Sequence, residues 1–208
     1  PDSDTLTVTA IRVGSSEGAG TAGSIDSALT GTYGQLTIAA NGSYTYVANQ
    51  AAADALDPGD VVTDAFNYTV SDGNGEDDIA VLTITVVGIN DTPSADNETG
   101  AVNEDATLTV SDGTSDVLHG DTDVDDSSSL TVTTYSHTSA TAVGGGSAST
   151  GNGNSNTAGS GTVVGYYGTL TLAADGTYTY AADQDTADAL DATVDTVTDV
   201  FTYTVSDG

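Results

Sequence analysis

The sequence contains no cysteine, methionine or tryptophan, and Arg12 is its single basic residue. Without cysteine there is no disulfide framework, so stability has to come from packing, hydrogen bonds or bound ions. Without clustered lysine and arginine the chain cannot neutralise phosphates, which excludes nucleic acid as a partner and argues against anionic membrane surfaces. No apolar run is long enough for a membrane span, so membrane insertion is not expected.

Residues typical of catalytic centres are equally scarce. His119 and His137 are the two histidines, and there is no cysteine nucleophile. Serine and aspartate are so frequent that their coincidence with a histidine has no diagnostic value. We therefore expect no enzymatic activity.

Acidic residues dominate what is present. The chain has 31 acids and a formal net charge of -30, and 27 of the acids are aspartate. Aspartate favours turns, and its short carboxylate suits loops that wrap a hard cation. Leucine, isoleucine, valine and phenylalanine make up 40 of 208 residues, a share that is typical of disordered chains at this charge. An ordered fold therefore needs something that offsets repulsion and supplements a thin core.

An internal repeat argues for such an ordered fold. The segment "VTDAFNYTVSDG" (62–73) returns as "VTDVFTYTVSDG" (197–208), with ten of twelve residues identical. In the same order, "YGQLTIAANGSYTYVANQAAADALD" (33–57) matches "YGTLTLAADGTYTYAADQDTADALD" (167–191). The second copy carries about ten extra residues, in the Gly/Ser-rich stretch 144–161, which we expect to be a mobile surface insertion. The matches indicate a tandem array.

Each copy has the pattern of short strands. Apolar and polar residues alternate over 36–38 and 44–46, and the Asn41-Gly42 turn signal lies between them. The stretch 79–88 is a long uncharged strand, whereas only 50–57 and 184–191 favour a helical turn. Tyrosines at matching places should be core or half-buried sheet residues: Tyr44, Tyr46, Tyr68, Tyr178, Tyr180 and Tyr203. The pattern predicts antiparallel β-sandwiches with very little helix.

The repeat predicts two domains, 1–93 and 94–208. In this register the first lacks its N-terminal strands and the second lacks its last strand. An alternative stays open, in which the folding unit is offset and the segment 101–118 belongs to the first lobe.

Two acidic clusters have the composition of cation sites. In "DTDVDD" (121–126), an extended backbone places Asp121, Asp123 and Asp125 on one side, where they repel each other unless a cation sits among them. "SDGNGEDD" (71–78) gathers Asp72, Asp77 and Asp78 in a glycine-containing loop. Calcium takes six to eight oxygen ligands, so both clusters suit it. Neither has the spacing of an EF-hand, and the glycine-rich nonapeptide of calcium β-rolls is absent.

The linked segments "LDPGD" (56–60), "NDTP" (90–93), "NEDATLTV" (103–110) and "DTDVDD" give the chain a family resemblance. It resembles bacterial cadherin-like repeats, in particular the VCBS-type repeats of RTX adhesins. The resemblance implies tandem Ig-like, Greek-key sandwiches joined end to end, with several calcium ions at the junctions. It carries ligand roles over to Asp57, Asp60, Asn90, Asp91, Glu104, Asp121, Asp123 and Asp207. One departure concerns Asp60, because Gly59 occupies the place where animal cadherins have an acid. The central pair is either Asp121 with Asp123 or Asp123 with Asp125.

The function that the resemblance implies is structural. The chain would be a monomeric, calcium-rigidified extender of a large bacterial adhesin, secreted by the type I route to the cell surface. Its partners would be neighbouring repeats of the same chain, and its role would lie in adhesion and biofilm formation. The alternative is a calcium-dependent glycan- or surface-binding module that uses the 144–161 loop and the neighbouring Tyr166 and Tyr167.

Overall fold

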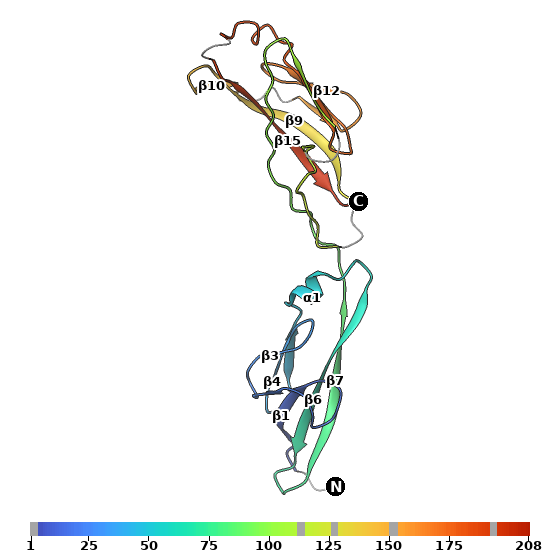
Figure 1. Ribbon diagram of the computed structural model, residues 1–208. Coiled ribbons are helices and arrows are strands. Elements are labelled where there is room, and N and C mark those ends of the chain that lie inside the picture. Colours follow the sequence, from blue (N-terminus) through green and yellow to red (C-terminus); the bar gives the residue numbers. More distant parts are fainter. Residues whose placement is uncertain (1–3, 112–114, 126–128, 150–153, 192–194) are drawn as a thin grey trace. The chain divides into compact units, whose positions relative to one another are not determined.

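The chain folds into two compact units (Figure 1). The computed structural model describes residues 4–111, 115–125, 129–149, 154–191 and 195–208. The first unit is Pro1–Asp91 with Val124–Ser127, and the second is Thr92–Asp123 with Ser128–Gly208. Each unit contains antiparallel sheets and almost no helix. The predicted all-β class is therefore confirmed.

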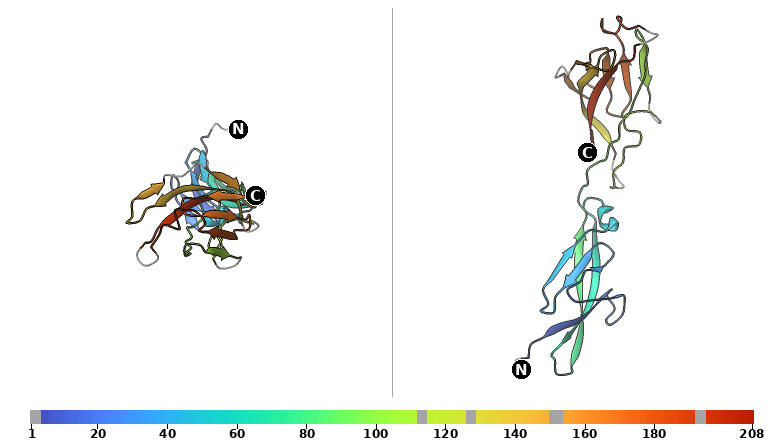
Figure 2. Two further views of the ribbon diagram at one scale, coloured as in Figure 1. Left: turned by 90° about the horizontal axis from the view of Figure 1, so that it is seen from above. Right: turned by 90° about the vertical axis from the view of Figure 1, so that its left-hand side faces the viewer.

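Two sheets form the first unit. One has the strand order β2-β1-β6-β7, from β1 (Thr7–Val13), β2 (Ala22–Gly23), β6 (Val61–Ser71) and β7 (Asp77–Val87). The other has the order β3-β4-β5, from β3 (Leu29–Thr30), β4 (Gln35–Ile38) and β5 (Tyr44–Val47). The helix α1 (Ala51–Asp54) follows β5. Two perpendicular views show the two sheets as facing layers (Figures 1 and 2).

The core of the first unit lies between these layers. Leu36 and Ile38 of β4 pack against Ile11 of β1 and Phe66 of β6, and all four are buried. Their positions follow the predicted alternation, which sends every second side chain of a strand inward. The β4–β5 hairpin turns at Asn41-Gly42, as predicted, with Gly42 at φ +83°. A positive φ costs glycine nothing, which is why the turn needs it.

Two further sheets form the second unit. In one, β9 (Thr131–Thr141) pairs with β10 (Ser147–Ser149), β11 (Ser155–Thr157) and β15 (Thr198–Ser206). The other has the order β12-β13-β14-β8, from β12 (Thr162–Val164), β13 (Thr169–Leu172), β14 (Tyr178–Ala181) and β8 (Thr107–Val110). The pairing of β8 with β14 places this part of the 101–118 segment in the second unit.

Two local expectations differ from the structure. The described parts of the Gly/Ser-rich stretch include β10 and β11, which pair with β9, so they form sheet rather than a free loop. The stretch 184–191 forms turns, in which Ala187 N–H donates to Gln184 O. Its counterpart in the first copy, 50–57, contains the helix α1. Asp185 and Thr186 replace two alanines of that helix, and both have lower helix propensity than alanine.

Each unit buries one aspartate of the repeated "VTD" phrase in the same way. Asp64 is 3% exposed and accepts hydrogen bonds from the backbone amides of Thr32, Tyr33 and Gly34 and from the Tyr46 hydroxyl. Asp199 accepts the same four bonds from Tyr166, Tyr167, Gly168 and Tyr180. In the second unit a further side chain contacts this aspartate, since His137 Nε2 lies 3.2 Å from Asp199 Oδ1. These carboxylates tie the turn before β4 or β13 to the opposite sheet.

The donors also set the charge state of Asp64. Burial alone would raise the pKa of its carboxyl, but the bonds from Tyr46 and the three amides outweigh burial and lower that pKa. A lowered pKa in the folded state means that the stabilisation is complete above the ordinary aspartate range. It is lost as the pH falls through the folded-state value.

We therefore predict that Asp64→Asn lowers the free energy of unfolding of the first unit by about 2 kcal/mol at neutral pH, because buried amides lose a charged acceptor. The variant should also lose less stability than the parent on acidification. Amide exchange of β4 and β6 between pH 7 and acidic pH measures both effects. Asp54→Asn, at an exposed site in α1, is the matched control. Equal acid sensitivity of Asp64→Asn and the parent would contradict the assignment.

Candidate metal centre

Three carboxylates meet in the second unit. Asp96, Glu98 and Asp121 each place one carboxylate oxygen within 4.8 Å of the others. A short antiparallel bridge brings their segments together, with Ser94 N–H donating to Thr122 O at 2.8 Å and Thr122 N–H to Ser94 O at 3.0 Å. Beside this bridge, Asp96 N–H donates to Asp121 Oδ1 at 3.0 Å. The backbone therefore holds three acids at one point despite their like charge.

The electrostatics of this cluster are unfavourable without a cation. Burial raises the pKa of Glu98 and of Asp121, and the neighbouring charge of Asp96 raises both further. The Tyr203 hydroxyl contacts Glu98 and also the Asp96 carbonyl. Asp121 Oδ2 is buried and has no hydrogen-bond partner among the described residues. Such an oxygen, among three carboxylates, fits a bound divalent cation.

A second pair of acids lies elsewhere in the same unit. Asp123 and Asp207 are half-buried, and their carboxylate oxygens also lie within 4.8 Å of each other. Asp207 directly follows β15, at the end of the repeated "SDG" phrase. Glu104, also half-buried, has a buried Oε2 without a hydrogen-bond partner in the described part of the chain.

Further predicted ligands belong to the first unit. Asp125, which is 4% exposed, accepts a 3.0 Å hydrogen bond from Asp91 N–H. Asn90 is exposed and donates its amide to Asp91 O at 2.8 Å. Asp57 Oδ1 is buried and lacks a hydrogen-bond partner among the described residues. Asp60, the residue that departs from the cadherin pattern, is exposed.

The loop 71–78 does not gather its acids in this way. Asp72 Oδ1 accepts hydrogen bonds from the amides of Asn74 and Glu76, so it closes a local turn. Asp77 and Asp78 are exposed at the start of β7, and Asp78 accepts from Ile79 N–H. Among the described residues these acids form no three-carboxylate cluster. Their role as calcium ligands stays a prediction.

Asp96 and Glu98 are not among the ligands that the sequence predicted. They lie outside every quoted motif, 25 and 23 residues before Asp121. The sequence does show the two acids at alternate positions after a proline, which places them on one side of an extended segment. This pattern does not identify Asp121 as their partner, because their contact depends on the bridge between Ser94 and Thr122.

Tyr166 and Tyr167, the aromatic pair proposed for ligand contact, differ in their exposure. Tyr167 is buried, and its hydroxyl donates to Thr141 O at 2.9 Å, so it serves the core. Tyr166 is 37% exposed and packs edge-on against Tyr167. Only Tyr166 remains available for a surface contact.

Comparison with known proteins supports the interpretation of the fold. The sequence model of the bacterial cadherin-like domain family matches residues 1–88 and 90–208 of the chain. The chain therefore belongs to this family. The chain is also similar to the calcium-binding lectin RapA2 of Rhizobium johnstonii, with 33% identity over 76 residues. That match covers 36% of this chain and 32% of the lectin, so the chain spans about a third of that relative. Among the described residues, no helix has the length and apolar character needed to cross a membrane.

Calcium binding to the Asp96 cluster should depend on pH and on Glu98. We predict that Glu98→Gln weakens one calcium-binding event about tenfold or more, because the cation loses one charged ligand. Since the pKa values of Glu98 and Asp121 are raised, affinity should fall once the pH drops into their elevated range. Isothermal titration calorimetry measures both effects, with the exposed Glu17→Gln as the control.

Without calcium, in the presence of a chelator, the raised pKa values of Glu98 and Asp121 make the stability of the second unit depend on pH in the opposite direction. Raised carboxyl pKa values mean that the calcium-free second unit loses stability as the pH rises through them. Glu98→Gln should remove part of that loss. An unchanged calcium isotherm together with an unchanged pH profile would show that the cluster binds no cation.

Proposed function

We propose that this chain is a calcium-stiffened extender segment of a large bacterial surface adhesin, without enzymatic activity. The observation that carries this proposal is the Asp96, Glu98 and Asp121 cluster, which holds a buried oxygen without a hydrogen-bond partner. It occurs in a chain that consists of two cadherin-like copies. Calcium that binds only to the folded state would add binding free energy to folding and remove negative charge.

The mechanical role follows from where the acids lie in the sequence. Asn90 and Asp91 lie in the segment between β7 of the first unit and β8 of the second, and the run from Asp121 to Asp125 lies between β8 and β9. Calcium bound by such segments would restrict their backbone freedom, because each carboxylate ligand fixes the segment that carries it. A tandem array would then project a distal ligand-binding domain, and strong like charge would keep neighbouring arrays apart. Secretion by the type I route into calcium-rich medium belongs to this proposal.

A lectin-type role is the second candidate. One observation favours it, the similarity of a 76-residue stretch to a calcium-binding lectin. The exposed Tyr166 offers an aromatic surface of the kind that stacks on sugar rings. In this alternative, calcium would order a glycan-contacting surface instead of a connecting segment.

Small-angle scattering separates the two candidates when it is combined with glycan binding. For the extender, excess calcium should give a narrow distribution of particle dimensions, and chelator should broaden it. Magnesium at equal concentration should not replace calcium, because it prefers fewer ligands and retains its water. For the lectin, a glycan array should show calcium-dependent binding that Tyr166→Ala abolishes. Identical scattering with calcium and chelator would contradict the extender proposal.

A further inference from the structure

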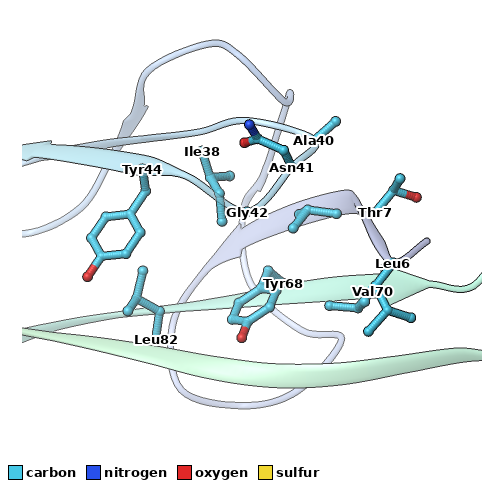
Figure 3. A pocket seen from close by; sticks show the side chains of 11 residues that line it. Leu6, Thr7, Ile38, Ala40, Asn41, Gly42, Tyr44, Tyr68, Val70 and Leu82 are labelled. Atoms are coloured by element: carbon cyan, nitrogen blue, oxygen red, sulfur yellow. The ribbon is translucent and has the colours of Figure 1, made fainter. Parts of the chain in front are cut away.

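The first unit has an apolar groove that its own residues leave open. The groove has a volume of about 250 Å³ and lies between the β4–β5 hairpin and the β1–β6–β7 sheet. Figure 3 shows Ile38 and Tyr44 on the hairpin side, opposite Tyr68, Val70 and Leu82. Leu6 is 64% exposed and Tyr44 is 51% exposed, although Tyr44 has the alternation of a core or half-buried residue. That expectation for Tyr44 was wrong for the unit as it stands.

The repeat provides an internal comparison for this groove. Its lining residues Leu6, Ile38, Gly42 and Tyr44 align with Leu130, Leu172, Gly176 and Tyr178 of the second copy. There, Leu130 and Tyr178 are half-buried. The same side chains are therefore more covered in the second unit than in the first.

The covering residues in the second unit come from the segment that precedes β9. Val117 is buried in the core cluster that Tyr178 borders, and its N–H donates to Gly176 O at 3.1 Å. A side chain added at Gly176 would meet Leu118 at 2.9 Å, whereas at Gly42 it would meet nothing within 4 Å. Val117 and Leu118 thus occupy the place that is open beside Gly42.

The neighbouring strand edge differs in the same way. In the second unit β14 pairs on its outer side with β8, with Tyr178 opposite Val110 and Tyr180 opposite Leu108. In the first unit the matching strand β5 pairs with β4, and no described strand lies on its other side. An unpaired edge beside an apolar groove is a template for an added strand.

We propose that the β5 edge and the groove of the first unit accept a segment of the same kind as 107–118, supplied by a repeat that precedes Thr5. Its strand would run antiparallel to β5, with the residue that corresponds to Val110 opposite Tyr44 and that of Leu108 opposite Tyr46. The residues that correspond to Val117 and Leu118 would fill the groove beside Gly42. Each repeat would thereby complete its own sandwich with the segment just before it, as the second unit does here.

The proposal is tested by adding that segment. A copy of residues 101–128 is placed directly before Thr5 in the full chain, which reproduces the sequence context that precedes Ser129. Amide exchange over residues 44–48 should slow by about tenfold or more, because the outer amides of β5 gain acceptors. The matched control carries Leu108→Asp and Val117→Asp in the added copy only, and it should leave exchange over 44–48 as fast as in the parent.

Exchange of β9 and β15 in the same samples reports whether the second unit remains folded. Unchanged exchange over 44–48 in the extended chain would overturn the proposal. So would protection of 44–48 in the unextended chain that rises with protein concentration, because the groove would then be filled by a second copy. Equal protection by the extension and by its double-aspartate control would also overturn it, since the apolar contacts would then be irrelevant.

Discussion

Repulsion between carboxylates opposes the folding of this chain, in addition to the loss of conformational entropy that every chain undergoes. It has 31 acids, one base and small cores built from a few aliphatic and aromatic residues. Like charges repel more strongly as they leave water. An acid is therefore stable on the surface, beside several donors, or beside a cation, and the described residues include candidates for all three.

Asp64 and Asp199 illustrate the use of donors, since three amides and a tyrosine hydroxyl face each carboxylate. Within the described part of the chain, the Asp96 cluster has fewer donors for its three acids, chiefly one amide and one tyrosine hydroxyl. Hydrogen-bond donors thus compensate the negative charge of Asp64 and Asp199 in the cores, but they compensate less of it at the cluster. In the proposed function, bound calcium would meet this need and would link the stability of the sandwich to that function.

The sequence predicted the sheets well because strand alternation and the Asn41-Gly42 turn are local signals. It predicted Asp121 and Asp123 as cation ligands because they form a dense run, and both lie near other acids in the structure. It could not predict Asp96 and Glu98, because their contact with Asp121 depends on a bridge between distant segments. Nor could alternation reveal that Tyr44 is exposed, since burial of a strand face depends on what covers it.

We propose that calcium provides the stability that the thin core and the charge of -30 withhold. Thermal unfolding of this chain in excess calcium, in excess magnesium and in chelator tests it most directly. We expect a much higher unfolding midpoint in calcium than in chelator, with the midpoint in magnesium close to that in chelator. Midpoints that coincide in all three conditions would contradict it, because the acids would then be solvated surface groups that the fold tolerates unaided.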